Sequence, residues 1–348
     1  MNDDKALIHT DLNRITATWG GEGLMRRWIS EWLEHLGQLV AAGGLTSATA
    51  STYESRMRRW CAWIDGRVPT PAEVQDWVIA LCDDGLKPAS VGNHLAAVKA
   101  FFRWCEATGR WPAVARSVRA PREFRDGPLA ALSREQAEAL IDFFRNEEMA
   151  STGERGAAKQ ALRKSRDIAL ALTLLGTGLR TISLVRADVK DLDLTSSPPR
   201  LLHRPKGHRA VDEWAALPPE AAAALQRYAT RRSELCGDPG PLWVGVHPRL
   251  GSRLNGASIR RIVARGMNGI GIDVKAPGNA GQWGPHCLRR TAVTIVADEA
   301  GIEEAQIVAG HASVDQTRRA YARVNKHRVQ ARVAPLLDFG KRRPNDGA

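Results

Sequence analysis

Apolar residues recur at helical spacing four times between residues 23 and 115, and this pattern limits the fold more than any other feature of the sequence. Four large apolar side chains would share one face of the first helix: Leu24, Trp28, Trp32 and Leu36. The same spacing predicts three more helices, at about 46–64, 70–85 and 89–107. Short links between four such helices favour a compact helical domain whose tryptophans lie in the core.

Two of the predicted helices begin with a capping signal. Thr70 precedes Pro71, which suits the first helical position, and Glu73 follows three residues after Thr70. Ser133 stands three residues before Gln136, which is the same arrangement of cap and partner. The second signal marks the first helix of a new domain.

The stretch 116–128 contains two prolines, a glycine and several arginines, which is typical of an interdomain linker. Beyond it we expect helices at about 134–146, 158–178 and 219–233, strands between 200 and 217, and a turn into a basic helix at 252–271. The predicted chain is mainly α-helical and has five parts: a flexible arm at 1–22, a helical domain at 23–115, the linker at 116–128, an α-rich domain with a small antiparallel β-sheet at 129–332, and a tail at 333–348.

The charge balance favours a polyanionic partner. The 348 residues include 50 Lys and Arg against 38 Asp and Glu, which gives a net charge of +12 and a pI near 10.0. Six arginines from basic clusters are the candidate nucleic-acid contacts: Arg56, Arg59, Arg119, Arg122, Arg260 and Arg261. The alternative interpretations are that the basic balance only aids solubility and that the clusters are solvated helix faces.

Several other classes of protein are disfavoured. The five cysteines are scattered and form no Cys-x-x-Cys pair, which argues against a zinc site and against a disulfide framework. The first residues lack the pattern of a signal peptide, and no apolar run approaches the length that spans a membrane. We therefore expect a soluble, cytoplasmic protein without a metal.

The segment from Pro285 to Tyr321 holds residue types that suit attack on a phosphodiester. His286 and Arg289 are three residues apart, so a helix would place a proton-transfer group beside a fixed cation on one face. His311 and Tyr321 add a second imidazole and a phenol. Such an attack needs a nucleophile, an acid for the leaving group, and cations around a phosphorus that gains negative charge.

Two further candidates lie upstream of this segment. Arg180 follows a Gly-Thr-Gly turn, and Lys206 occupies a Lys-Gly turn between two short extended runs. Ordinary structural roles are open to each candidate: Arg180 could neutralise a helix C-terminus, Lys206 could be a surface turn residue, and Tyr321 could be packed in the interior. The two histidines could cap a helix or lie in the core.

Taken in order, the six candidates resemble the catalytic set of the tyrosine recombinase (lambda-integrase-like, phage integrase or Xer-type) family: Arg180, Lys206, His286, Arg289, His311 and Tyr321. The resemblance covers about residues 130–330. More loosely it covers 25–112, where the pattern is similar to the family's helical core-binding domain. It implies that a DNA-binding core-binding domain and an α-rich catalytic domain clamp DNA.

The resemblance implies a site-specific DNA recombinase or integrase. Tyr321 would attack the scissile phosphate and form a 3′-phosphotyrosyl link, while Arg180 and Arg289 stabilise the charged phosphorane. The histidines would assist by hydrogen bonding and proton transfer, and Lys206 would protonate the leaving 5′-oxygen. Because the covalent intermediate keeps the bond energy, no cofactor is expected.

The implied partner is double-stranded DNA with inverted-repeat sites, bound at the nucleoid by a homo-tetramer on two sites. The apolar cluster at 333–339 is the candidate segment for docking on a neighbouring protomer, although it could fold back on its own domain. A type IB topoisomerase, and a non-cleaving DNA-binding regulator on the same fold, are the alternative functions. The sequence leaves open the DNA target, the kind of genetic element and any helper proteins.

Two features depart from the family's pattern. The family usually has an acidic residue three positions after the first arginine, but Ser183 stands there, and Asp188 arrives early. Tyr321 follows His311 by ten residues, one more than usual. Because one extra residue would turn the phenol by about 100° on a continuous helix, we expect the insertion to lie in a loop at 312–316.

Overall fold

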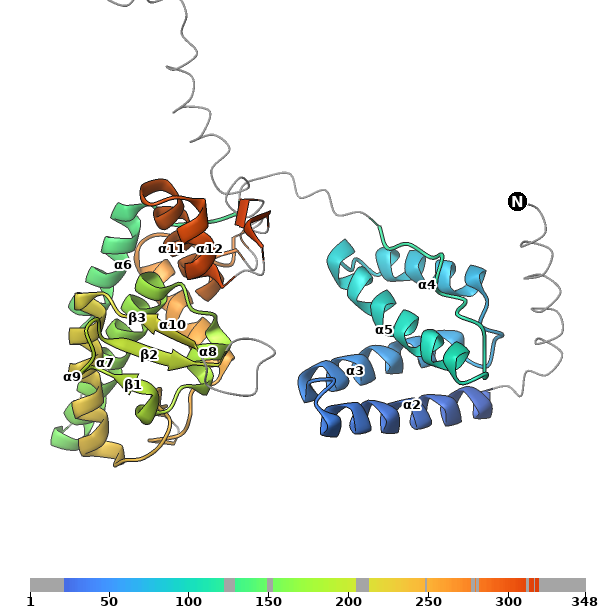
Figure 1. Ribbon diagram of the computed structural model, residues 1–348, viewed down its shortest axis with the longest axis horizontal. Coiled ribbons are helices and arrows are strands. Elements are labelled where there is room, and N and C mark those ends of the chain that lie inside the picture. The colour runs from blue at the N-terminus through green and yellow to red at the C-terminus, as the bar shows by residue number, and fades with distance from the viewer. Residues whose placement is uncertain are drawn as a thin grey trace, which may run out of the picture. The chain divides into compact units, whose positions relative to one another are not determined.

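The computed structural model divides the chain into two compact units, Met1–Asp126 and Gly127–Ala348 (Figure 1). The structure describes residues 22–121, 129–148, 153–204, 213–247, 249–276, 279, 282–310, 313–315 and 317–318. Within these ranges the chain is mainly helical, with one small antiparallel sheet in the second unit, so the predicted fold class is confirmed. Residues 1–21 of the arm, residues 122–128 of the linker and the tail lie outside the described residues, and the five-part division stays a prediction.

The first unit contains the four predicted helices. They are α2 (Glu22–Ala42), α3 (Ser47–Ile64), α4 (Pro71–Asp83) and α5 (Pro88–Ala107). Thr46 and Thr70 cap α3 and α4, because each side chain accepts a hydrogen bond from the backbone N–H three residues on. Gly43 has a φ of 81°, which lets the chain turn directly after α2.

Aromatic side chains fill the core of the first unit. Trp60 is fully buried and meets Trp77 and Phe102 edge-on, at ring-centroid distances of 5.1 and 6.0 Å. Edge-to-face contacts of this kind stabilise a core beyond the area that the rings bury. The interpretation of these tryptophans as core residues is confirmed.

The buried face of α2 is only partly the predicted one. The buried apolar residues of this helix are Met25, Ile29, Trp32 and Leu36. Leu24 and Trp28, which the spacing assigned to the same face, are half-buried. Residues 24 and 25 both continue the apolar spacing, and the contacts of α2 with α3 and α5 decide between them.

The second unit places eight helices and three strands in sequence among its described residues. They are α6 (Arg134–Asn146), α7 (Gly153–Thr177), α8 (Thr181–Arg186), the 3-10 helix η1 (Val189–Asp191), β1 (Leu192–Asp193), β2 (Arg200–His203), β3 (Glu213–Ala216), α9 (Pro219–Cys236), α10 (Gly256–Gly269), α11 (Pro285–Glu299) and α12 (Ile302–Ala309). The strands pair in the order β1-β2-β3, with Leu201 opposite Ala215 and Leu202 opposite Trp214. Ser133 and Gln136 form the predicted reciprocal capping box at α6.

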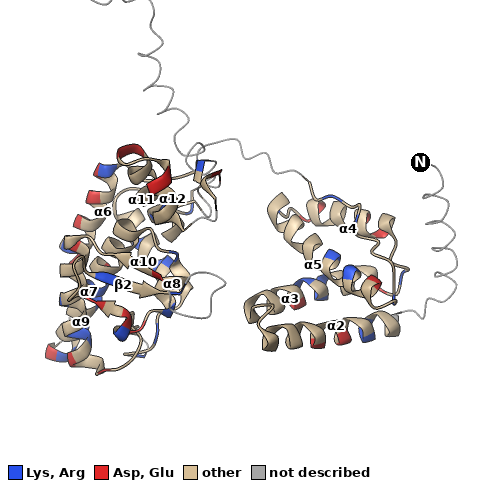
Figure 2. Cartoon of the chain, viewed as in Figure 1, with Lys and Arg blue, Asp and Glu red and all other residues tan. Residues whose placement is uncertain are grey.

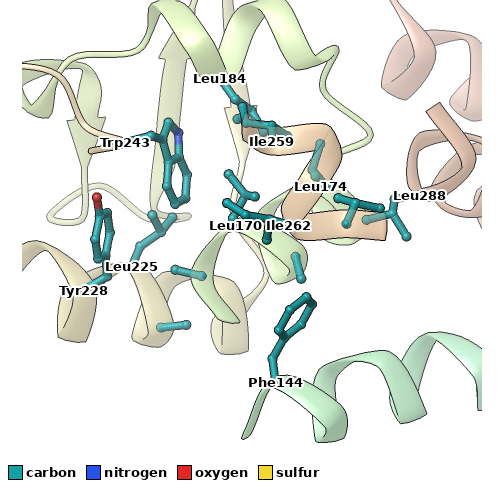
Figure 3. Packing of buried hydrophobic residues seen from close by; sticks show 14 of the residues in the cluster. Phe144, Leu170, Leu174, Leu184, Leu225, Tyr228, Trp243, Ile259, Ile262 and Leu288 are labelled. Atoms are coloured by element: carbon teal, nitrogen blue, oxygen red, sulfur yellow. The ribbon is translucent and has the colours of Figure 1, made fainter. Parts of the chain in front are cut away.

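Helix α7 organises the second core, since it contacts α6, α9 and α11 (Figure 1). Its buried Leu170 and Leu174 meet apolar side chains from several other elements, among them Leu225 of α9, Ile262 of α10 and Leu288 of α11 (Figure 3). The helix that carries His286 and Arg289 is therefore fixed to the centre of this unit through Leu288.

Tyr228 belongs to this core and has no free hydroxyl. Its O–H donates to the Leu242 carbonyl at 2.8 Å and accepts from the Val244 N–H at 3.0 Å, while its ring stacks on Trp243 (Figure 3). Burial raises the pKa of this phenol above its usual range. Tyr228 is therefore a structural residue of the core.

A buried ion network joins α7 to α10. The Asp167 carboxylate, only 1% exposed, accepts from Arg166 Nε at 2.8 Å and from Arg265 Nη2 at 2.6 Å. Arg265 also pairs with Glu147 at 3.0 Å. Arg265 lies on the same basic helix as Arg260 and Arg261, but its side chain turns towards this buried network.

We expect Asp167→Ala to lower the free energy of unfolding of the second unit by about 3–5 kcal/mol, because it leaves the buried Arg166 cation without its carboxylate. Urea unfolding followed by circular dichroism measures this change, and the first unit, which contains no part of the network, provides an internal reference. Arg145→Ala removes exposed ion pairs to Asp142 and Glu220 and should cost at most about 1 kcal/mol. Equal losses in the two variants would contradict the assignment of the network as a buried one.

Candidate active site

Helix α11 carries His286 and Arg289 on one face, as predicted. Pro285 occupies its first position, where a missing N–H costs no hydrogen bond. His286 follows in the first turn and Arg289 lies three residues later. The two side chains are neighbours on the helix surface because residues three apart lie on the same face.

The Arg289 guanidinium is buried and joins the ends of two other helices. It is 8% exposed and donates through Nη1 to the Gly178 carbonyl and through Nη2 to the Ala309 carbonyl. Gly178 follows the last residue of α7, and Ala309 is the last residue of α12. One side chain therefore holds α11, α7 and α12 together at this place.

Gly178 is suited to this contact in two ways. Its φ of 61° lies in the left-handed region, which glycine adopts without strain. A Cβ atom there would also lie 3.0 Å from Val308 Cγ1 on α12. The Gly-Thr-Gly turn seen in the sequence thus brings the end of α7 against α12 and directs a carbonyl to Arg289.

Arg180 reaches the same end of α12. It stands between α7 and α8, and its Nη2 donates to the Gly310 carbonyl at 3.1 Å. Gly310 is the left-handed residue that ends α12, so both guanidinium groups bind the C-terminal carbonyls of one helix. Arg180 and Arg289 are thereby brought together, as the prediction requires.

The cluster formed by Arg180, Arg289 and His286 is positively charged and has no negatively charged partner among the described residues. Burial, and then the neighbouring Arg180, lower the pKa of Arg289 to about 10. Burial, and then the cations Arg289, Arg290 and Arg180, lower the pKa of His286 below its usual value. Among the residues that the structure describes, no carboxylate pairs with Arg180 or Arg289. An oxyanion is the group that would compensate this charge.

Ser183, where the family has an acidic residue, is buried on α8 and makes a different contact. Its hydroxyl donates to the Arg204 carbonyl at 3.4 Å, the long limit of a hydrogen bond. Arg204 precedes the undescribed residues 205–212, which include Lys206. Ser183 thus connects the helix that follows Arg180 to the chain that leads to Lys206.

Arg253 fixes the other end of α8, and nothing in the sequence pointed to it. Its Nη1 donates to the carbonyls of Val185 and Ala187, at 3.0 and 3.1 Å, and its Nη2 pairs with Asp188. The Asp188 N–H in turn donates to Asp191 at 2.8 Å, at the start of η1. Arg180 is therefore followed by a helix that is held at both ends.

The profile of the phage integrase family matches residues 131–328, and that of the phage integrase N-terminal SAM-like domain matches residues 29–109. Tyrosine recombinase XerC of Corynebacterium glutamicum is 31% identical over 308 residues, which cover 86% of this chain and 88% of that protein. The chain belongs to the phage integrase family. The predicted family and class of enzyme, a tyrosine recombinase, are confirmed.

Solved structures of other phage integrase family members share the fold. The Tn1549 transposon integrase in complex with a circular intermediate DNA has a TM-score of 0.63 at 18% identity, over 87% of this chain and 98% of that one. The XerH site-specific recombinase bound to palindromic difH substrate has a TM-score of 0.61 at 17% identity, over 83% and 80% of the two chains. These likenesses extend over both units of the family fold.

Three of the six predicted catalytic residues of this phage integrase family member lie outside the described residues: Lys206, His311 and Tyr321. The loop predicted at 312–316 is wrong for Val314 and Asp315, which are helical, as are Thr317 and Arg318. Asp315 lies 3.8 Å from Arg318, an i,i+3 pair that supports the helix. Among the described residues of this interval, the helical Val314, Asp315, Thr317 and Arg318 therefore offer no loop position for the inserted residue.

Five of the six predicted DNA-contacting arginines are described, and their role stays a prediction. Basic residues mark α3 in Figure 2, where Arg56 donates to the Asn93 carbonyl at 3.0 Å and Arg59 pairs with Asp84 at 2.6 Å. The exposed members are Arg59, Arg119, Arg260 and Arg261, and Arg56 is half-buried. Arg122 lies outside the described residues. An arginine on an exposed helix face can exchange such contacts for a phosphate.

The described residues contain neither a metal cluster nor a membrane-spanning helix. No group of three or more His, Cys, Asp and Glu side chains that could hold a metal ion occurs among the described residues. None of the described helices is both long and apolar enough to span a membrane.

The lowered pKa of His286 predicts a pH-dependent part of the stability. Above about pH 6.5 both the folded and unfolded states hold a neutral imidazole. Below it the unfolded chain binds the proton first, so this contribution is lost as the pH falls through the folded-state pKa. We expect the free energy of unfolding of the second unit to fall less between pH 7.5 and 5 in His286→Asn than in the unchanged protein.

Urea unfolding at a series of pH values checks this expectation. His94, whose pKa burial also lowers, is present in both proteins, so the difference between them isolates His286. The same pH dependence in both proteins would contradict a lowered pKa of His286 in the folded state.

Proposed function

We propose that this protein cleaves and rejoins DNA at specific sites, with Tyr321 as the nucleophile and the cluster of Arg180, Arg289 and His286 as the phosphate-binding centre. The observation that carries the proposal is the convergence of two guanidinium groups on the end of α12, with no carboxylate among the described residues to neutralise them. A scissile phosphate would supply the missing negative charge. Charge-assisted, forked contacts to its oxygens are stronger than those to neutral carbonyls.

The reaction follows from the charges. The Tyr321 oxygen attacks the phosphorus, a phosphotyrosyl bond forms, and the bond from phosphorus to the 5′-oxygen breaks. Negative charge grows on the phosphoryl oxygens in the pentacoordinate state, where Arg180 and Arg289 stabilise it. Because Arg289 is buried and already held at two points, it needs little reorganisation when that charge develops.

Proton transfer is assigned by environment. The lowered pKa of His286 keeps its imidazole neutral at neutral pH, so it can accept a hydrogen bond or a proton from the attacking phenol. His311 assists by hydrogen bonding. Lys206 protonates the leaving 5′-oxygen, and the Ser183 hydroxyl contacts the Arg204 carbonyl two residues before it. The phosphotyrosyl bond retains the energy needed for rejoining, so the exchange needs no nucleotide.

The partners follow from the relatives and from the stoichiometry of exchange. The XerH structures contain difH DNA, and one lambda integrase structure is a tetramer bound to a Holliday junction. For this chain we infer double-stranded DNA with paired inverted sites and a homo-tetramer, since two duplexes require four cuts. The segment 333–339 is the docking element. Sizing complexes on DNA with and without the residues after Gln330 tests this, because the truncated chain should bind single sites but form no tetramer.

A type IB topoisomerase would use the same phosphotyrosyl chemistry on one duplex. The match of residues 29–109 to the N-terminal SAM-like domain of phage integrases favours the recombinase. Exchange of strands between two labelled duplexes, rather than relaxation of one supercoiled plasmid, distinguishes the two activities.

We expect Tyr321→Phe to abolish cleavage and to leave DNA binding nearly unchanged, because only the nucleophilic oxygen is removed. A nicked suicide substrate should trap a covalent complex that survives denaturation with the unchanged protein and not with the variant. Tyr53→Phe is the matched control, since Tyr53 packs against Trp32 in the first unit. Trapping by Tyr321→Phe would remove Tyr321 from the mechanism, and trapping by no form of the protein would favour a non-cleaving DNA-binding regulator.

We expect a substrate with a 5′-phosphorothiolate to restore cleavage to Lys206→Ala, because a thiolate leaves without protonation. The measurement compares single-turnover cleavage of the sulfur and oxygen substrates. Lys190→Ala, at an exposed position on η1, is the control and should cleave both as the unchanged protein does. Rescue of His286→Ala in place of Lys206→Ala would instead identify His286 as the acid.

A further inference from the structure

The chain enters the second unit through residues 129–132, which belong to no strand among the described elements. This junction segment follows directly on the linker residues 122–128 and precedes the N-cap Ser133. Leu132 is buried in the core of the second unit. Backbone groups in such a place require hydrogen-bond partners.

Side chains from α11 and from the turn before it supply those partners. Arg290 Nε donates to the Ala130 carbonyl at 2.6 Å, and the Ala130 N–H donates to Gln282 Oε1 at 3.1 Å. The Leu132 N–H donates to Thr291 Oγ1 at 2.8 Å. Three hydrogen bonds thus bind the junction segment along α11.

Two of these residues also bind each other. Arg290 Nη2 donates to the Gln282 carbonyl at 2.6 Å, so Arg290, Gln282 and Ala130 form a closed ring of three hydrogen bonds. Gln282 lies three residues before Pro285, where α11 begins. The ring therefore fixes both the junction segment and the start of the helix that carries His286.

Arg290 is adjacent in sequence to Arg289 and points to a different neighbour, since successive residues of a helix are turned by about 100°. Arg289 binds the ends of α7 and α12, whereas Arg290 binds the junction segment. A displacement of the junction segment is transmitted to α11 within one residue of the catalytic guanidinium.

The geometry points to Arg290 and Gln282 as positioning residues that couple the linker to the active site. When the first unit binds DNA, it determines the position of the junction segment, and the ring of hydrogen bonds then places His286 and Arg289 for the reaction. This inference rests on the proposed DNA cleavage. Arg290 is also near enough to His286 to contribute to its lowered pKa.

The experiment uses the full-length protein with two changes, alone and together. Arg290→Gln breaks the ring, and insertion of Gly-Ser-Gly-Ser after Arg125 loosens the linker while leaving every contact of the second unit in place. Single-turnover cleavage of a suicide substrate is measured at saturating protein, with the dissociation constant for DNA and the unfolding temperature measured beside it.

We expect each change alone to slow cleavage about tenfold at saturation, with DNA affinity within about twofold. The double variant should be no slower than either single variant, because either change alone already uncouples the linker from α11. Arg134→Gln is the matched control. It removes an exposed ion pair between the start of α6 and Glu299 at the end of α11, and it should cleave normally.

Two outcomes would overturn the coupling. In one, the variant with the linker insertion cleaves at the unchanged rate when it is fully bound to DNA. This result can be interpreted whether or not Arg290→Gln folds. In the other, the two changes multiply, which is the behaviour of an Arg290 that only stabilises the fold. An unchanged protein that forms no covalent complex would overturn the proposed function itself, so the two failures are distinguishable.

Discussion

The functional end of the second unit depends on how the buried Arg289 guanidinium finds hydrogen-bond acceptors. A buried charge without partners is strongly unfavourable, and the chain provides carbonyls at the end of α7 and at the end of α12. One side chain thereby fixes segments that are 111 and 20 residues away in sequence. Displacing either carbonyl would leave the cation unsatisfied, so the positions of these helix ends and of the cation determine one another.

The same cluster is poorly arranged for stability alone. Elsewhere in the second unit buried arginines have carboxylate partners: Arg166 pairs with Asp167 at 2.7 Å and Arg232 with Asp238 at 2.5 Å. Arg289 has only neutral carbonyls and a second cation nearby, and its pKa falls to about 10 through burial and Arg180. A fold that compensates its other buried charges leaves this one to be compensated by a ligand. That contrast, more than the residue types themselves, supports the proposal that this cluster binds a phosphate.

Features set by neighbours in sequence were predictable, and features set by distant contacts were not. Ser133 and Gln136 identified the start of α6, because a capping box needs only four consecutive residues. The face of α2 was assigned partly wrongly, since residues 24 and 25 continue the apolar spacing equally well and only packing separates them. The His286 and Arg289 pair was predictable for the same local reason as the caps. Arg253 and Arg290 gave no signal, because their partners Asp188 and Ala130 lie 65 and 160 residues away.

The geometry of a helix explains why six consecutive residues at the start of α11 each make a specific contact. Six consecutive residues, each turned by about 100° from the last, face three different surroundings. Two face the cationic cluster, two lie in the core and two bind the junction segment: His286 and Arg289, Cys287 and Leu288, Arg290 and Thr291. None of the six is a freely replaceable surface position. A substitution at Leu288 therefore acts through packing, one at Arg289 through the contacts that hold the ends of α7 and α12, and one at Arg290 through the path of the chain into the unit.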